Sequence, residues 1–307
     1  MNTRIGYVGL GRMGGALAGR LLKSLALDVY DLDPVGVARL ASLGARPQAG
    51  LDQLGRACDL VLMCLPTSDH VRQAVFGPRG LLEGLSPGAL LVDQSTGDPQ
   101  ATRAMATELA ARGIGLVDAP VSGGVQGAEA GTIAIMLGAG PLERDRVEPV
   151  LRAISPNVFH AGGVGAGHVI KLVNNLISGA QRLLTMEGVA LAAKNGIDPQ
   201  RACNILMAGG ARNVFLEKFM GPQILHGRLD VAFTLGLMHK DVRLACELGS
   251  ASGVPLPFGN TAREFYRQCI DAMGEHAQVH TAALVYDRLA GTQVVPAVPA
   301  AETRPGA

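Results

Sequence analysis

The first half of the chain alternates short hydrophobic runs with amphipathic stretches. Residues 4–8 form an apolar run that ends at a glycine, residues 13–24 have helical spacing, and residues 27–31 form the next run, which predicts strand, helix, strand. Similar runs predict further strands at residues 60–65, 89–93, 114–118, 132–137 and 158–160. Helical patterns lie between most of them, notably at residues 99–112 and 141–154. This alternation predicts an α/β fold of Rossmann type, with a doubly wound, mainly parallel sheet that binds ligands at the carboxyl ends of its strands.

The second half of the chain has helical periodicity and no convincing strand. A long helix is expected over residues 168–195, and further helices are expected at residues 199–207, 215–225, 240–250, 257–273 and 276–289. We therefore expect three parts: a dinucleotide-binding domain over residues 1–163, an all-helical substrate and oligomerisation domain over residues 164–290 that opens with the long interdomain helix, and a disordered, Pro/Ala-rich tail over residues 291–307.

Composition narrows the class of protein. The 307 residues have room for two domains, and 27 basic against 26 acidic residues give no field that favours nucleic acid or an anionic membrane. No apolar stretch reaches the ~18 residues of a spanning helix, and the first residues lack a secretory pattern. Five scattered cysteines without Cys-x-x-Cys are typical of reduced thiols, so we expect a cytoplasmic protein. The apolar helical half favours a homodimer or homotetramer.

A glycine motif lies where the first strand meets the first helix. It reads Gly9-Leu10-Gly11-Arg12-Met13-Gly14. Gly9 permits a tight turn, Gly11 allows close approach of a pyrophosphate, and Gly14 allows close packing of helix on strand. The start of the helix adds amide donors for the phosphates. All six residues are expected to contact a dinucleotide; the alternative is a glycine-rich turn without a ligand.

Asp31 ends the second predicted strand and bears on the choice of nicotinamide cofactor. A carboxylate there accepts hydrogen bonds from the adenosine ribose and repels a 2′-phosphate. Arg39 is the nearest downstream base, in the middle of a predicted helix, and Asp33 adds a second negative charge. Asp33 also suits the N-cap of a helix that starts at Pro34. The sequence therefore favours NAD over NADP.

Two polar segments follow later strands at their carboxyl ends. They are Leu65-Pro66-Thr67 and Ser95-Thr96. Each suits either the lining of a cofactor crevice or an ordinary turn or helix cap.

Lys171, Asn174 and Asn175 lie at positions i, i+3 and i+4 of the long predicted helix and so share one face. Asn is a poor residue inside a helix, so two in succession indicate a tertiary role. Lys171 stands among apolar neighbours, and a partly desolvated lysine has a lowered pKa and can exchange a proton near neutrality. The alternative is a snorkelling lysine beside two asparagines that bond a loop.

A second candidate lies after the strand that ends at Asp118. Ser122, Gly123 and Gly124 offer a hydroxyl and two unhindered amides, which suit a carboxylate. The alternative is a β-turn that closes a hairpin with residues 132–137.

These motifs together resemble the β-hydroxyacid dehydrogenases, the family that includes 3-hydroxyisobutyrate dehydrogenase and tartronate semialdehyde reductase. The resemblance covers about residues 4–289 and four motifs in order: the glycine motif, residues 118–124, residues 165–175, and Lys240-Asp241-x-x-Leu244-Ala245. It implies that Lys171 is the acid/base, that Asn175 positions lysine and substrate, and that Asn174 lies at the substrate. Ser122, Gly123 and Gly124 would bind the substrate carboxylate. The cofactor would also contact Leu65, Pro66, His70, Thr96 and Lys240.

The chain departs from the family pattern in two places. Relatives often read Ser-Gly-Arg-Asn-Trp where this chain has Gly-Ala-Arg212-Asn-Val, and residues 279–282 lack the usual acidic residue before the Ser-Ala pair. Both segments belong to the helical half, so the group that meets the far end of the substrate is open. His276 and His280 stand at i, i+4, but without a third ligand we expect surface or substrate-pocket roles and no metal site.

The predicted activity is interconversion of a small β-hydroxy acid and its semialdehyde or keto acid, with NAD as hydride carrier and Lys171 as acid/base. Three alternatives share the architecture: a 6-phosphogluconate dehydrogenase-like enzyme, an imine reductase-like enzyme, and a non-catalytic dinucleotide-binding scaffold. The first would need a longer helical domain and a basic phosphate cluster. Lys171 counts against the second, and Lys171, Asn175 and Ser122 together count against the third.

Overall fold

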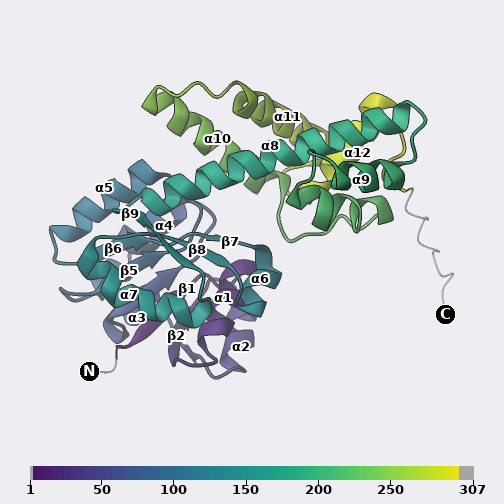
Figure 1. Cartoon of the computed structure of the whole chain (residues 1–307). Helices are drawn as coiled ribbons and strands as arrows, with labels where there is room; N and C mark the ends of the chain where they lie inside the picture. The colour runs from purple at the N-terminus through teal and green to yellow at the C-terminus, as the bar shows by residue number, and fades with distance from the viewer. Residues whose placement is uncertain (1–2, 297–307) are drawn as a thin grey trace, which may run out of the picture. The chain divides into compact units, whose positions relative to one another are not determined.

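The computed structural model describes residues 3–296, which form two compact units. They divide between Val173 and Asn174, inside the 29-residue helix α8 (Ala166–Lys194), drawn in Figure 1. We call residues 3–173 the sheet unit and residues 174–296 the helical unit. The sequence placed the change of architecture at the start of this helix, whereas the compact units divide eight residues inside it.

The described residues of the sheet unit form one nine-stranded sheet in the order β3-β2-β1-β4-β5-β6-β8-β7, with β9 beside β8. The strands are β1 (Ile5–Val8), β2 (Leu27–Tyr30), β3 (Arg46–Pro47), β4 (Leu60–Met63), β5 (Leu90–Asp93), β6 (Gly115–Asp118), β7 (Val121–Ser122), β8 (Ala134–Gly138) and β9 (Val158–Gly162). All pairs are parallel except those that β8 makes with β6 and β7. The prediction of a doubly wound, mainly parallel sheet is confirmed. The two-residue strands β3 and β7 are too short to leave a pattern.

Helices cover the two faces of this sheet. They are α1 (Arg12–Leu21), α2 (Pro34–Ala41), α3 (Leu51–Ala57), α4 (Ser68–Phe76), α5 (Pro99–Ala110), α6 (Gly124–Ala130) and α7 (Pro141–Ile154), with a 3₁₀ turn η1 (Leu81–Glu83). Strand side chains alternate between two cores: Leu60 and Leu62 pack with α1, α2, α6 and α7, whereas Val61 and Met63 pack with α3, α4 and α5. Because both faces of the central strands β1, β4 and β5 are buried, these strands are continuous apolar runs in the sequence.

The helical unit has one core, built around the second part of α8. Its other elements are α9 (Pro199–Ala208), the π-turn η2 (Leu216–Met220), the 3₁₀ turn η3 (Ile224–His226), α10 (Leu235–Ser252), α11 (Pro257–Met273), the 3₁₀ turn η4 (Val279–Thr281) and α12 (Ala282–Ala290). The prediction of a regular helix over residues 215–225 was wrong. Gly221 and Pro222 divide it into two short turns, because Pro lacks the N–H that continues a helix.

The beginning of the expected tail is packed against the helical unit. Asp287 accepts hydrogen bonds from the Thr292 hydroxyl (2.6 Å) and from the amides of Val294 (2.7 Å) and Val295 (2.8 Å). Both valine side chains are buried in the core. The expectation of disorder from residue 291 therefore does not hold for these residues, and residues 297–307 lie outside the described part of the chain.

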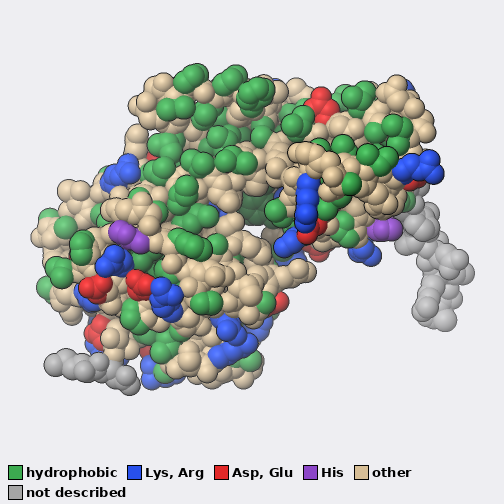
Figure 2. All heavy atoms as spheres, viewed as in Figure 1, with side chains coloured by type: hydrophobic (Ala, Val, Ile, Leu, Met, Phe, Trp, Pro, Cys, Tyr) green, Lys and Arg blue, Asp and Glu red, His purple; other side chains and the backbone are tan. Residues whose placement is uncertain are grey.

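Large apolar side chains also lie on the surface of the helical unit. Ile177, Leu184 and Leu191 of α8 are spaced seven residues apart and are all exposed. Figure 2 shows further hydrophobic side chains over α10 and α11. Within residues 3–296, no helix is at once long and apolar enough to span a membrane.

Candidate functional site

The glycine motif forms the turn from β1 into α1. Gly9 has φ +88°, and a Cβ there would clash with the carbonyl oxygen of Cys64 after β4. A Cβ at Gly14 would clash with the carbonyl oxygen of Gly9, so helix and strand approach as closely as glycine allows. A Cβ at Gly11 would meet no atom within 4 Å. The turn therefore has an open side at Gly11, the first residue before α1, where a phosphate group can come close to backbone amides.

Asp31 lies beside this turn, directly after β2. Its carboxylate accepts the amide of Leu10 on one oxygen and that of Asp33 on the other (2.7 Å). Asp33 caps α2 by accepting from Val35 (2.9 Å), as its position before Pro34 predicts. The side chain of Arg39 reaches back from α2, and its Nη2 donates to the Leu10 carbonyl (2.9 Å). Arg39 is thus closer to the glycine turn than its position in the middle of a helix suggests. The glycine turn therefore has the carboxylate of Asp31 and the guanidinium of Arg39 beside it.

The loops after β4 and β5 are tied to each other. Ser95 Oγ accepts from the amide of Leu65 (2.9 Å), and Ser68 Oγ accepts from the amide of Asp98 (2.8 Å). These bonds hold Leu65 and Pro66 near the Ser95-Thr96 segment at the carboxyl edge of the sheet. Thr67 also caps α4, as the helix-cap alternative for that segment expected, whereas α5 is capped by Asp98 and not by Ser95 or Thr96. His70 is exposed in the first turn of α4, with Nδ1 2.7 Å from the Thr67 hydroxyl.

Ser122 lies in β7, which pairs antiparallel with β8 through Val121–Ile135 and Ser122–Ala134. Helix α6 separates the two strands, so the hairpin alternative is correct in its pairing but wrong in its tight turn. Gly123 and Gly124 have φ +139° and +70°, which side chains rarely adopt. A Cβ at Gly124 would meet open space, whereas one at Gly123 would press on Ile133 at 3.3 Å. The open side of this loop is therefore at Gly124.

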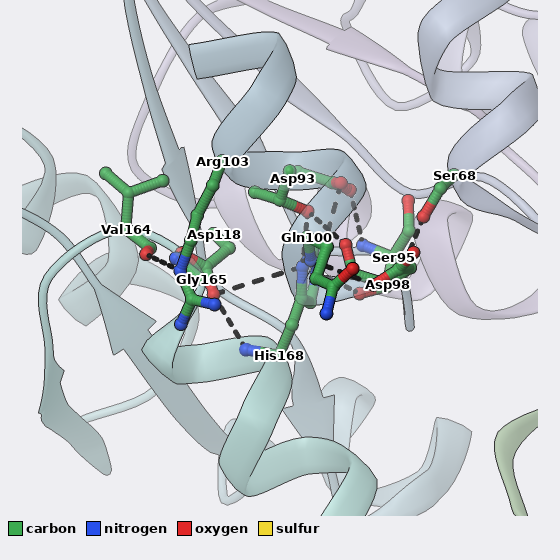
Figure 3. A network of polar contacts seen from close by, with 11 residues as sticks. Ser68, Asp93, Ser95, Asp98, Gln100, Arg103, Asp118, Val164, Gly165 and His168 are labelled. Carbon is green, nitrogen blue, oxygen red and sulfur yellow. Dashed lines mark hydrogen bonds and ion pairs between the residues drawn. The ribbon is translucent and has the colours of Figure 1, made fainter. Parts of the chain in front are cut away.

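Asp118, four residues before Ser122, fixes the start of α8. It ends β6, is buried, and accepts the amides of Gly165 (2.6 Å) and His168 (2.7 Å), as Figure 3 shows. Burial raises the pKa of this carboxyl, and the charge of His168 and the two amide bonds oppose that rise. Lys171 follows one turn later and is only 8% exposed. One carboxylate thus links the strand that leads to Ser122 with the helix that carries Lys171.

Asn174 and Asn175 stand on α8 just beyond the unit boundary. Asn175 is buried and donates from Nδ2 to Oδ2 of Asp241 (2.6 Å), and Asn174 donates to the Oδ1 of Asn175 (2.9 Å). Lys240 Nζ lies 3.1 Å from the other oxygen of Asp241. The structure therefore joins two expected site residues, Asn175 and Lys240, through a buried carboxylate. Asp241 was not proposed from the sequence, although it stands inside the quoted Lys240-Asp241 motif.

The two histidines considered as a metal pair lie in different surroundings. His276 is exposed and lies 3.6 Å from Glu275, whereas His280 is fully buried in η4 and packs in an edge arrangement against the rings of Phe215 and Phe219. Burial first, and then the positive charge of Arg182, lower the pKa of His280 to about 3. Arg212 is exposed and bonds Glu217 (3.3 Å). Within residues 3–296 no cluster of three or more His, Cys, Asp or Glu side chains is arranged to hold a metal ion.

Comparison with known proteins accounts for both units. A family model described as the NAD binding domain of 6-phosphogluconate dehydrogenase matches residues 4–163, and one described as NAD-binding of NADP-dependent 3-hydroxyisobutyrate dehydrogenase matches residues 165–286. The chain is 35% identical over 295 residues to 2-(hydroxymethyl)glutarate dehydrogenase of Eubacterium barkeri, which covers 95% of this chain and 98% of that protein. The chain belongs to the β-hydroxyacid dehydrogenase family.

Two further comparisons agree with this membership. The chain is 37% identical over 282 residues to 3-hydroxyisobutyrate dehydrogenase of Pseudomonas aeruginosa, which covers 89% of this chain and 94% of that protein. The fold matches a structure of Mycobacterium tuberculosis 3-hydroxyisobutyrate dehydrogenase with L-serine at a TM-score of 0.82 and 27% identity, over 93% of this chain and 99% of that one. The chain is accordingly an oxidoreductase of small hydroxy acids that uses a nicotinamide dinucleotide.

Proposed function

We propose that the chain oxidises a small β-hydroxy acid with NAD, and reduces the matching semialdehyde or keto acid, with Lys171 as acid/base. The observation that carries this proposal is the anchoring of Lys171. Asp118, at the end of β6, accepts hydrogen bonds from two amides at the start of α8 and so fixes this helix to the strand that precedes Ser122. Lys171 follows in the next turn of the helix and is nearly buried. A proton-transferring side chain needs such a fixed position relative to its substrate, because catalysis depends on alignment of the reacting groups.

In the oxidative direction, neutral Lys171 accepts the proton of the substrate hydroxyl at Nζ. In the reductive direction, the protonated Nζ donates that proton and stabilises the negative charge that develops on the oxygen. Nicotinamide, when bound, supplies the site that accepts or gives up hydride. Asn175 positions the lysine and the substrate. Asp241 holds the side-chain amide of Asn175 in place by accepting a hydrogen bond from its Nδ2.

The substrate carboxylate is held by the loop of Ser122, Gly123 and Gly124. Gly124 offers open space where a side chain would otherwise stand, so the loop has room for an anion beside its backbone. Donors aimed at a carboxylate form charge-assisted hydrogen bonds, which are about twice as strong as neutral ones. A carboxylate at this loop and a hydroxyl at Lys171 define the substrate as a hydroxy acid.

Asp31 is the basis for proposing NAD over NADP. Its carboxylate lies next to the glycine turn, where it can accept from ribose hydroxyls and would repel a 2′-phosphate. The positive charge of Arg39 would instead favour the 2′-phosphate of NADP. However, its Nη2 already donates a hydrogen bond to the Leu10 carbonyl. The other cofactor contacts of the proposal are the glycine motif with Leu65, Pro66, His70, Thr96 and Lys240.

The exposed apolar stripe of α8, defined by Ile177, Leu184 and Leu191, supports the further proposal of a homodimer or homotetramer. A spacing of seven residues keeps side chains on one face of a helix, which suits packing against another helix. Leaving three such side chains in water forgoes the free energy of their burial. The proposal of a cytoplasmic location rests on the five cysteines, which are all free thiols.

Initial rates with a panel of β-hydroxy acids, each with NAD and with NADP, test the proposed function. We expect NADH formation with at least one acid and a higher kcat/KM with NAD. The methyl ester of the best acid is the matched control, and it should react much more slowly because it lacks the carboxylate. Equal rates for acid and ester, or no turnover with any β-hydroxy acid, would contradict the proposal.

A further inference from the structure

His168 is a buried side chain near Lys171 whose two ring nitrogens both have hydrogen-bond partners, and the proposed reaction does not use it. It lies in the first turn of α8, three residues before Lys171, and is fully buried. Its Nε2 lies 3.0 Å from the carbonyl oxygen of Ser95, and its Nδ1 lies 2.9 Å from the hydroxyl of Thr102 in α5. A carbonyl only accepts hydrogen bonds, so Nε2 carries a hydrogen and donates it.

Two buried carboxylates flank the imidazole. Asp93 Oδ2 lies 3.9 Å from Nε2, and Asp118 Oδ2 lies 3.9 Å from Nδ1. Asp93 holds the same loop by accepting the amide of Ser95 on its Oδ1 (2.9 Å). Figure 3 shows His168 from α8 between the loop that follows β5 and the end of β6. The ring is therefore oriented from both sides, with negative charge near each of its nitrogens.

We propose that His168 is a positioning residue, which fixes the turn of α8 before Lys171 relative to the loops after β4 and β5 that are expected to contact the cofactor. The link has two steps. The carbonyl of Ser95 accepts from His168, and the hydroxyl of the same serine accepts from Leu65, so one residue joins α8 to the loops after β4 and β5. Thr96, an expected cofactor contact, follows directly.

The glycines around His168 leave little freedom for another arrangement. A Cβ at Gly97 would press on Cε1 of His168 at 3.2 Å, and a Cβ at Gly167 would clash with the carbonyl oxygen of Met136 in β8. The start of α8 thus lies against the sheet on one side and against the Ser95 loop on the other. Without the imidazole, the loop would lose its bond to the helix while Asp118 still held the helix start.

This inference rests on the proposed function, because it assigns His168 the task of aligning Lys171 with the cofactor. Small displacements of a reacting group lower kcat strongly without a matching loss of binding. We therefore expect His168→Leu to lower kcat about ten- to a hundredfold, while KM for the acid and Kd for NADH change less than about threefold. His168→Gln retains an N–H donor for the Ser95 carbonyl and should recover most of kcat.

His160→Leu is the matched control. His160 lies in the same unit on β9, and its Nε2 is also hydrogen-bonded to a backbone carbonyl, that of Ala139 (3.0 Å). Within residues 3–296, His160 forms no hydrogen bond or ion pair with the Ser95 loop or with α8, so kcat should be unchanged. A fall in kcat for His168→Leu no larger than for His160→Leu would overturn the proposal, as would failure of His168→Gln to recover activity lost in His168→Leu.

Amide hydrogen exchange gives a readout independent of turnover. In His168→Leu, exchange should accelerate in residues 95–98 and in residues 166–170, and His168→Gln should return both segments toward the original rates. Faster exchange in residues 166–170 alone would overturn the proposal, because His168 would then stabilise only its own helix. If the unaltered protein turns over no hydroxy acid, the proposed function fails, and the exchange result by itself decides whether His168 ties loop to helix.

Discussion

At the carboxyl edge of the sheet unit, Asp118 and His168 have a hydrogen-bond partner for every polar side-chain atom, whereas Arg182 and His280 in the helical unit do not. Asp118 accepts two backbone amides, and both ring nitrogens of His168 have hydrogen-bond partners. In the helical unit, Nε and Nη1 of Arg182 and both ring nitrogens of His280 make no hydrogen bond with any residue in the described part of the chain. The guanidinium carbon of Arg182 lies instead 4.6 Å from the ring centre of Phe215.

We interpret this difference in hydrogen bonding as a difference in role: the bonded groups are expected to hold the candidate site in place, and the unbonded groups are expected to lower the stability of the fold. A satisfied network fixes the backbone segments it joins, which is what a catalytic edge requires. An unsatisfied buried nitrogen costs free energy, of which the contact between Arg182 and the aromatic rings offsets a part. Changes at the sheet edge should therefore alter catalysis, and changes at His280 should alter stability.

The largest expected effect is that of Lys171→Ala. Loss of the acid/base should lower kcat about 10²- to 10⁴-fold, while NAD binding stays nearly intact because the lysine lies outside the glycine turn. Lys194→Ala, at the other end of α8, is the control and should behave like the original protein. Steady-state rates and the Kd for NADH check the prediction, and near-normal kcat in Lys171→Ala would remove the proposed mechanism.

Ser122→Ala should have the next largest effect, and it should appear in KM. Removing one donor to a carboxylate costs about 1.5–3 kcal/mol, so KM for the acid should rise roughly ten- to a hundredfold. KM for the methyl ester should rise much less, since the ester has no full negative charge. A parallel rise for acid and ester would show that the loop does not recognise a carboxylate.

Asp31→Ser should alter the choice of cofactor and leave the chemistry intact. Removing the charge beside the glycine turn should raise the kcat/KM for NADP relative to NAD about tenfold, which is ~1.4 kcal/mol. The measurement is the ratio of the two kcat/KM values in the original protein and in the variant. A higher kcat/KM with NADP than with NAD in the original protein would contradict the proposal that Asp31 makes the protein prefer NAD.

His280→Leu should leave activity unchanged and reduce the sensitivity of the fold to acid. The pKa of His280 is lowered from 6.5 to about 3, so the unfolded chain takes up its proton first as the pH falls. The contribution of neutral His280 is therefore nearly complete above pH ~6.5 and is lost between that pH and about 3, by about 1.4 kcal/mol at pH ~5.5. Urea unfolding at several pH values should give a shallower slope for His280→Leu than for His226→Leu, a variant of an exposed histidine; equal slopes would contradict the assignment.

The sequence predicted the strands and helices of the sheet unit well because the patterns that indicate them involve residues close together in the chain. Apolar runs, the glycine spacing and the polar residues after each strand end all have direct structural meaning at the carboxyl edge of a parallel sheet. The two-residue strands escaped detection because they are too short to show periodicity. In the helical unit, the interruption at Pro222 follows from a local rule that the helical periodicity masked, whereas the packing of Val294 and Val295 depends on tertiary contacts.

The sequence allowed candidate site residues to be named, but it did not reveal the contacts that the structure shows around them. Lys171, Asn175 and Ser122 stand in recognisable motifs, but Asp118, His168 and Asp241 form hydrogen bonds with partners far away in the chain, such as Gly165 for Asp118 and Ser95 for His168. A buried carboxylate inside a motif, as at Asp118 and Asp241, is the one signal that could have found two of them.

Chemical rescue of Lys171→Ala tests the central claim most directly, because it asks whether the missing group is a proton-transferring amine. NADH formation by this variant should increase with the concentration of added methylamine and, at fixed total amine, with the fraction of free base as the pH rises. Tetramethylammonium at equal ionic strength carries a positive charge and no transferable proton, so it should give no increase. A rate that rises equally with both cations, or with neither, would contradict the role of Lys171 as the acid/base.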